Sequence, residues 1–400
     1  MRARLYRSSM RWRLHTNPVS LVLSLAAVAA VLGMPFLRVA ANRLVSGEPV
    51  FLGAMLHGPA RAWVMVLLAL LVLMVLLSLV QPSKPVLWLQ TAMALALLGG
   101  ALVLAGMHAS QIAPTLPPFA RTSLGGAWWA LVALMSLTAQ HAVQRLQLAG
   151  MARTSLLLAL GIAIGGLLLS GGCNDLSIMK ELANQSDILW AATARHLLIV
   201  WLALMPTLLI GVPLGWWAYR TQAARQAMFA VLNVIQTIPS IALFGLLMAP
   251  LALLAAQFPA LAQAGMSGVG LLPGVIALTL YALLPVARGA LAGLEHVPSA
   301  VRYAALGMGM SHAQVFTQVE LPLALPVLLT GVRTAAVQAV GLASVTALIG
   351  AGGLGAIMFE GLFSGAQDLV LLGVLPILLL AALTDAFFKL LVRLAQPVQP

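Results

Sequence analysis

Long runs of apolar residues, separated by short polar connections, make up most of the chain. A helix rises about 1.5 Å per residue, so about 20 apolar residues cross the hydrocarbon layer of a bilayer. Backbone polar groups in lipid must be bonded within the protein, which favours helices. The pattern predicts an all-α, polytopic helical membrane protein with about ten transmembrane helices. The predicted spans are residues 19–37, 62–80, 86–107, 124–140, 154–172, 196–218, 227–250, 271–290, 323–349 and 369–391.

Charged residues are scarce and unevenly placed. Only 8% of the 400 residues are charged and 62% are hydrophobic, whereas soluble domains carry about a quarter charged residues. With the N-terminus inside, fifteen of the 21 basic residues fall on the cytoplasmic side and six fall outside. Cytoplasmic connections carry the excess of Lys and Arg, so both termini are predicted to be cytoplasmic. The net charge of +12 therefore reflects topology and does not indicate a nucleic-acid partner.

The chain changes character near residue 173. Five predicted spans with short connections precede this point, and five spans with more internal proline, glutamine and serine follow it. We predict an N-terminal accessory region (residues 1–172), an external linker (residues 173–195) and a transmembrane core (residues 190–391). The first apolar run follows a basic head, as in a signal sequence. It exceeds the usual apolar core of about 7–15 residues, so we expect it to be retained.

The longest predicted cytoplasmic connection, residues 291–322, has the pattern of two short helices. Pro298 and Ser299 predict a helix start, because proline fixes φ and serine can cap the first turn. Gly307 and Gly309 are expected to end this helix. A second short helix is expected to begin after them and to stop at a proline that opens the next span.

The residues of this connection have a recognisable spacing. They are Tyr303, Ala304, Ala305, Gly307, Gly309, Val319, Leu321 and Pro322. The spacing resembles the loop of ABC importer permeases: Glu-Ala-Ala, three residues, Gly, nine residues, an aliphatic residue, one residue, Leu-Pro. Tyr303 stands where that family commonly has glutamate. The resemblance implies a type I ABC permease core of five helices, with these residues coupled to an ATPase subunit. An ordinary amphipathic loop helix is the alternative.

Further segments of the core resemble a narrower group. They are residues 196–197, 211–215, 236–240, 281–285 and 350–355. These segments resemble permeases that import osmoprotectants such as glycine betaine, choline and carnitine, and the five N-terminal spans resemble the Yeh-type osmoprotectant permeases. The methionine permease group shares the general plan, so an amino acid or another small solute is the alternative substrate.

The chain has no phosphate-binding loop of its own. Such a loop needs Gly-Lys-Ser/Thr, and Lys84, Lys180 and Lys389, the only lysines, follow serine, methionine and phenylalanine. Residues 350–355 match G-x-G-x-x-G but lack the preceding strand that dinucleotide binding requires. We therefore expect no enzyme activity, cofactor or metal in this chain, with ATP and Mg²⁺ bound by a partner subunit.

Two polar stripes mark candidate positions in the core spans. The first is Asn233, Gln236 and Ser240, spaced to share one helix face, and the second is Thr334 and Gln338, with Ser344 further on. Such stripes line a translocation pathway or bond helix to helix. Arg333, about ten residues into its span, is expected to face a wet cavity or to reach the inner interface by snorkelling.

Three classes of membrane protein are considered for this sequence pattern. An ion-coupled secondary transporter usually needs ionisable groups inside the membrane, and the nine acidic residues all fall in predicted loops or near span ends. An intramembrane enzyme would need a nucleophile–base or metal constellation, which the sequence lacks. The third class, an ABC importer permease, implies further partners: a periplasmic substrate-binding protein and a second permease chain, identical or homologous. Because mid-membrane aromatic residues are few, tight recognition of a quaternary ammonium is expected to belong to the binding protein.

Overall fold

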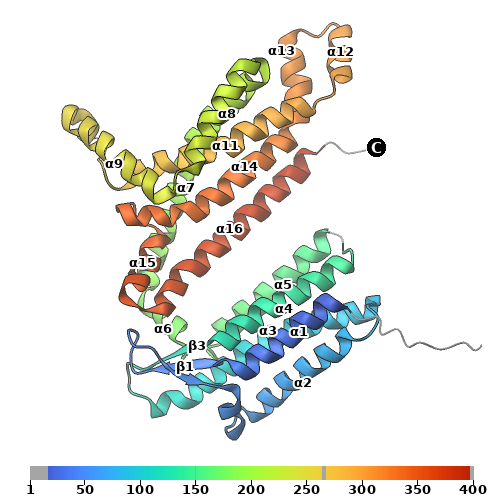
Figure 1. The fold of residues 1–400 in the computed structure, drawn as a ribbon, viewed down its shortest axis with the longest axis vertical. Helices are drawn as coiled ribbons and strands as arrows, with labels where there is room; N and C mark the ends of the chain where they lie inside the picture. Colours follow the sequence, from blue (N-terminus) through green and yellow to red (C-terminus); the bar gives the residue numbers. More distant parts are fainter. Residues whose placement is uncertain (1–16, 149, 264–266, 397–400) are drawn as a thin grey trace, which may run out of the picture. The chain divides into compact units, whose positions relative to one another are not determined.

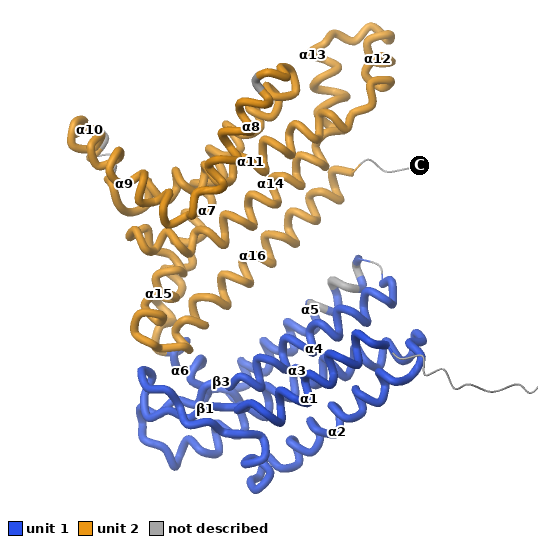
Figure 2. The backbone as a smooth tube through the Cα atoms, viewed as in Figure 1, with its two compact units in different colours: residues 1–183 blue, residues 184–400 orange. Residues whose placement is uncertain are grey.

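A computed structural model describes residues 17–148, 150–263 and 267–396. The chain forms two compact units, residues 1–183 and residues 184–400 (Figure 2). The five arginines before the first apolar run, which contribute to the predicted orientation, lie outside the described residues.

Unit 1 is a helical bundle with a small sheet at one end (Figure 1). Its helices are α1 (Pro18–Gly33), α2 (Arg61–Ser78), α3 (Lys84–Ile112), α4 (Gly126–Arg145), α5 (Gly150–Leu169) and α6 (Ser177–Asn184). Helices α3 and α4 pack together, and α1 packs on α4 and α2. Their buried faces form one core of apolar side chains, including Leu71, Leu97 and Leu131.

The sheet of unit 1 is a feature that the sequence pattern did not predict. Strands β1 (Leu37–Ala40), β2 (Glu48–Val50) and β3 (Arg121–Leu124) pair antiparallel in the order β2-β1-β3. The predicted span 19–37 is accordingly wrong at its end, because α1 stops at Gly33. Met34 precedes Pro35, and the residue before a proline is pushed into extended backbone.

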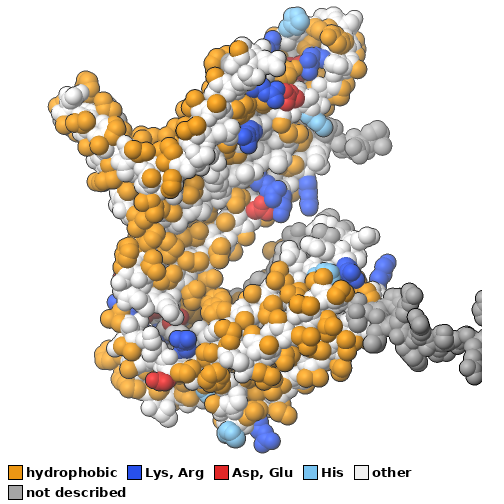
Figure 3. Space-filling view, viewed as in Figure 1, with side chains coloured by type: hydrophobic (Ala, Val, Ile, Leu, Met, Phe, Trp, Pro, Cys, Tyr) orange, Lys and Arg blue, Asp and Glu red, His pale blue; other side chains and the backbone are white. Residues whose placement is uncertain are grey.

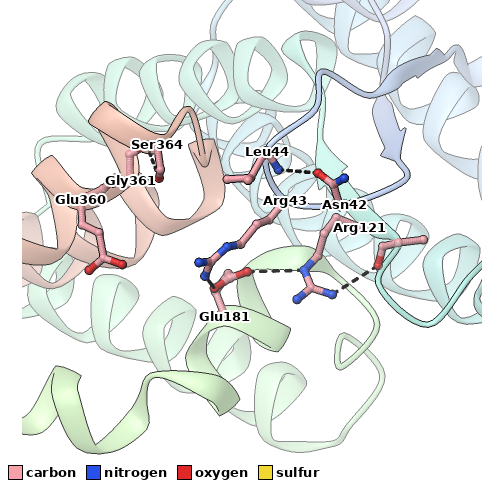
Figure 4. A network of polar contacts seen from close by, with 9 residues as sticks. Asn42, Arg43, Leu44, Arg121, Glu181, Glu360, Gly361 and Ser364 are labelled. Atoms are coloured by element: carbon pink, nitrogen blue, oxygen red, sulfur yellow. Dashed lines mark hydrogen bonds and ion pairs between the residues drawn. The ribbon is translucent and has the colours of Figure 1, made fainter.

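A buried carboxylate connects α6 to the sheet region (Figure 4). Glu181 is only 1% exposed. Its Oε1 lies 3.4 Å from Nε of Arg121 on β3, and its Oε2 lies 3.8 Å from Nη1 of Arg43 in the turn after β1. Two arginines from segments far apart in the chain therefore neutralise one buried acid.

Removing this charge is expected to destabilise unit 1. Glu181→Gln leaves the largely buried Arg121 without an ionic partner, at a cost of about 2–3 kcal/mol. The measurement is the thermal unfolding of the detergent-solubilised protein. Asp175→Asn is the control, because the Asp175–Lys180 pair, at 3.7 Å, is partly exposed and should contribute less than about 1 kcal/mol. Equal shifts for both variants would contradict this role of Glu181.

Unit 2 contains the long helices of the C-terminal half (Figure 1). They are α7 (Ser186–Arg220), α8 (Gln222–Thr237), α9 (Ser240–Gln257), α10 (Pro259–Gln263), α11 (Leu271–His296), α12 (Ser299–Gly307), α13 (His312–Gln314), α14 (Leu321–Ala343), α15 (Leu354–Ser364) and α16 (Gln367–Ala395). A π-helical turn, Val315–Glu320, joins α13 to α14, and a 3₁₀ turn, Val345–Ile349, follows α14. Helix α11 is central and packs on both α7 and α14.

Helices α11 and α14 approach closely enough that only glycine fits at their contact. A Cβ added to Gly331 would lie 2.5 Å from the carbonyl oxygen of Pro285 and 2.8 Å from Cα of Gly289. Small residues at a helix crossing let two backbones meet and gain van der Waals contact in a membrane, where no hydrophobic effect drives helices together. This crossing positions α11 and α14, the two helices that the connection of residues 297–320 joins.

The membrane character of the chain is confirmed. Among the described residues, seven helices are long and apolar enough to cross a membrane: Arg61–Ser78, Lys84–Thr115, Ser186–Arg220, Ser240–Gln257, Leu271–His296, His312–Ala343 and Gln367–Ala395. Hydrophobic side chains cover much of the visible surface, while charged groups gather in a few places (Figure 3). The chain is therefore an all-α, multi-pass membrane protein.

One predicted span of the core is wrong. Residues 227–250 form two helices, α8 and α9, which are separated at Ile238 and Pro239. Ile238 is extended, as the residue before a proline prefers, and Pro239 offers no N–H to continue the ladder. Figure 1 shows α9 turning away from α8 at this point. The predicted span 323–349 also ends early, with α14 stopping at Ala343, and helix α15 was not predicted.

Candidate functional site: the α12 elbow and the polar core positions

Helix α12 and its flanking turns form an elbow, residues 297–320, at one end of unit 2 (Figure 1). The expected start of α12 is nearly right, with one correction. Pro298 rather than Ser299 is the N-cap residue, and no side chain caps the first turn. Ser299 fails as a cap because it already lies inside the helix, where its backbone is helical. The end agrees with the expectation, since α12 finishes at Gly307 and Gly309 has φ +86°.

The second half of the elbow differs from the expectation. Ser311 caps α13 in a capping box with Gln314, but the helical backbone then continues through the π-helical turn into α14 and does not stop at Pro322. The wider π turn changes the hydrogen-bond register, so that Pro322 falls in the first turn of α14, where a missing N–H costs little.

The predicted coupling residues, in the elbow and at the start of α14, divide into an outward and an inward set. The exposed members are Tyr303, Ala304, Gly307, Gly309, Leu321 and Pro322. Ala305 is only 2% exposed and therefore packs inside the elbow, while Val319 is half-buried. The outward set therefore forms the exposed face of this segment, with Tyr303, 71% exposed, the largest side chain in it.

The prediction that the residues of the first polar stripe share one helix face is wrong. Ser240 lies on α9, beyond the break at Pro239, so it does not share a helix with Asn233 and Gln236. Gln236 donates from Nε2 to the backbone carbonyl of Tyr281 at 2.6 Å, and Asn233 accepts from Nη2 of Arg288 at 2.7 Å. In this structure the two α8 side chains therefore bond α8 to α11.

The second polar stripe is distributed over three environments. Thr334 is exposed and lines an open groove of about 440 Å³ between α11, α14 and α16. Gln338 is half-buried. Ser344 is buried, and its hydroxyl donates to the carbonyl of Gly341 at 2.7 Å. Of the six predicted pathway residues, only Thr334 lines this groove.

Arg333 has a partner that sequence reasoning missed. Its Nη2 lies 2.5 Å from Oδ1 of Asp385, and Nζ of Lys389 lies 2.7 Å from Oδ2 of the same carboxylate. Asp385 thus pairs with an arginine of α14 and with a lysine of its own helix. Asp385 is the nineteenth residue of the 29-residue helix α16, so it lies well inside that helix and not at its end as expected. An ion pair between α14 and α16 therefore satisfies Arg333.

The glycine-rich segment 350–355 contacts α7. Arg195 donates from Nε to the carbonyl of Ala351 at 2.9 Å, and Nε2 of His196 lies 3.0 Å from the carbonyl oxygen of Val340. A 3₁₀ turn, not a strand, precedes the segment. These contacts make it a connection that packs α14 and α15 against α7, and the strand–turn–helix context of a dinucleotide site is absent there.

Comparisons with known proteins agree with this architecture. Residues 14–179 match the family model described as the N-terminal domain of the ABC transporter permease YehY. Residues 208–396 match the model described as the binding-protein-dependent transport system inner membrane component. Both halves of the chain are thus matched by models of transport permeases.

Curated relatives match the C-terminal half. The osmoprotectant import permease protein OsmW of Salmonella typhimurium is 37% identical over 202 residues, which are 50% of this chain and 89% of that protein. The glycine betaine/carnitine/choline transport system permease protein OpuCD of Bacillus subtilis is 34% identical over 208 residues, which are 51% of this chain and 83% of that protein. A solved structure of the MetNI methionine ABC transporter aligns with a TM-score of 0.47 and 23% identity, covering 54% of this chain and 99% of that chain.

The membrane-spanning helices, together with the match to the inner membrane component of binding-protein-dependent transport systems, define a transport permease subunit. The chain belongs to the family of type I, binding-protein-dependent ABC transporter permeases, and its two halves have the arrangement of the YehY type.

Proposed function

We propose that this permease imports a small osmoprotectant, of the glycine betaine, choline or carnitine type, across the bacterial inner membrane. The observation that carries the proposal is the 37% identity to an osmoprotectant import permease over 89% of that relative. Related permeases at 31–36% identity are named for transport of choline, carnitine or glycine betaine. We place both termini in the cytoplasm, on the distribution of basic residues.

The energy for import is proposed to come from separate ATPase subunits that bind ATP and Mg²⁺. None of the three lysines has the context of a phosphate-binding loop. The outward residues of the elbow, foremost Tyr303, Ala304 and Gly307, are proposed to dock on the ATPase. A second permease chain, identical or homologous, would complete the pathway.

Tight recognition of the solute is proposed to lie with a periplasmic binding protein. A quaternary ammonium has no N–H group and is held best by aromatic faces. Among the residues that the structure describes, no aromatic residue lines the groove between α11, α14 and α16. We therefore expect the groove to bind a quaternary ammonium weakly, as transient passage requires.

An ion-coupled secondary transporter is the second candidate, because Asp385 lies well inside α16. Intramembrane carboxylates carry coupling ions in such proteins. Asp385 is paired with both Arg333 and Lys389, so its charge is already neutralised, which favours the ATP-driven alternative.

Reconstituted vesicles test the proposal. Vesicles containing the permease, its ATPase and its binding protein should accumulate radiolabelled glycine betaine or choline only when ATP is supplied on the ATPase side. Accumulation by the permease alone, driven by a sodium or proton gradient, would establish the second candidate instead. ATP-driven uptake of an amino acid but of no quaternary ammonium would overturn the substrate assignment.

A further inference from the structure

Two turns join helix α12 to its neighbours. Without side-chain contacts, these turns would allow α12 to move relative to the membrane helices. Val297 and Pro298 are extended at its start, and Gly309, with φ +86°, forms the turn at its end. A nine-residue helix between such turns transmits movement only if side chains hold it to the membrane helices.

One ion pair supplies this hold. Nε of Arg302, on α12, lies 2.7 Å from Oε1 of Glu320, the last residue of the π-helical turn before α14. Glu320 is only 7% exposed. Removing the partner of a buried charge is costly, because the charge that remains is desolvated and unpaired. The pair therefore holds α12 against the N-terminal end of α14.

The same guanidinium reaches two further elements. It lies over the ring of Tyr219, which is next to the last residue of α7. The guanidinium carbon is 5.7 Å from the ring centroid. Its Nη2 donates to the carbonyl of Val297, directly after α11, at 3.3 Å. Tyr219 also packs against the small apolar cluster of Leu294, Val297 and Ala324. One side chain thus contacts the ends of three membrane helices.

The ion pair also determines the charge of the surface that the elbow exposes to a partner. Arg302 is the only charged residue of α12, and its charge is matched by Glu320 inside the elbow. The outward surface carries Tyr303 and Met308, which are 71% and 78% exposed. The docking face of α12 is therefore uncharged.

We propose that Arg302 is a positioning residue for transport: together with Glu320 and Tyr219 it fixes α12 to α14 and α7, so that displacement of the elbow moves these helices together. This inference rests on the proposed docking of α12 on an ATPase subunit. Without the fixed contact, the turns at Val297 and Gly309 absorb the displacement and ATP hydrolysis no longer drives import.

Arg302→Gln and Glu320→Gln test the inference in the reconstituted transporter. ATPase co-purification and ATP hydrolysis should stay within about twofold of the parent, whereas uptake per ATP hydrolysed should fall at least roughly fivefold. Exchanging the charges in Arg302→Glu/Glu320→Arg should recover part of the loss. Arg302→Lys should be intermediate, because lysine keeps the ion pair but loses the planar group over Tyr219.

Arg225→Gln is the matched control. Arg225 lies 2.5 Å from Glu295, but both side chains are more than 40% exposed, so uptake per ATP should change by less than about twofold. Unchanged uptake per ATP in Arg302→Gln overturns the inference. Loss of ATPase association in that variant also overturns it, since Arg302 would then serve docking itself. Failure of the parent permease to bind an ATPase would instead refute the proposed function.

Discussion

Gly307→Trp is expected to abolish productive docking of the ATPase. Gly307 is exposed on α12, and a Cβ built there meets no atom within 4 Å. The indole would therefore project outward without disturbing the elbow and would separate the two docking surfaces. If Gly307 lies at the centre of the proposed docking face, we expect a cost of about 2–4 kcal/mol, a loss of roughly 30- to 700-fold in affinity. Co-purification of the ATPase and ATP-dependent uptake measure the effect.

The same substitution at Gly161 is the control. Gly161, on α5 of unit 1, is likewise exposed and has no atom within 4 Å of an added Cβ, and Gly161→Trp should leave ATPase association unchanged. Ala305→Trp is less informative, because Ala305 is buried and its replacement disrupts the elbow from within. An ATPase that still binds Gly307→Trp would show that α12 is not the docking surface.

Gly331→Leu is expected to separate α14 from α11. The first side-chain atom would lie 2.5 Å from a backbone oxygen of α11, and backbone cannot move aside as a flexible side chain does. Overpacking a close contact typically costs about 1–3 kcal/mol, and the upper end or more is expected where backbone is the obstacle. Thermal unfolding in detergent and the yield of monodisperse protein measure the loss, and uptake should fall with them.

Gly341→Leu on the same helix serves as the comparison. Gly341 is exposed, and an added Cβ there meets nothing within 4 Å, so this variant should unfold within about 0.5 kcal/mol of the parent. Equal losses at the two positions would mean that leucine at either glycine perturbs α14 in itself. The crossing of α11 and α14 would then not be the sensitive contact.

Sequence reasoning predicted the elements that depend on local chemistry. Pro298, Gly307 and Gly309 marked the limits of α12 because their effect on φ acts within one or two residues. The lengths of the apolar runs gave most of the membrane helices for a similar reason: span length is set by the bilayer. The coupling role of these residues stays a prediction.

Contacts between distant residues were not predictable in the same way. Arg302 and Glu320, or Arg333 and Asp385, are paired through tertiary structure, and no local pattern states which helices will be neighbours. The inward position of Ala305 was missed because a motif gives spacing but not the face that packs. Ser240 was grouped with Asn233 on spacing alone, whereas the break at Pro239 places Ser240 on a separate helix, α9.

The three short strands of unit 1 are expected to lie outside the hydrocarbon layer. An open sheet edge presents unpaired N–H and C=O groups, which hydrocarbon does not tolerate. The strands Leu37–Ala40, Glu48–Val50 and Arg121–Leu124 must therefore meet water or headgroups. The end of α1 and the start of α4 are each joined to a strand by only a few residues, so we expect both helix ends to lie near the same water-facing side. An accessibility label placed at Asn42 and one placed at Ser123 should consequently report the same aqueous compartment.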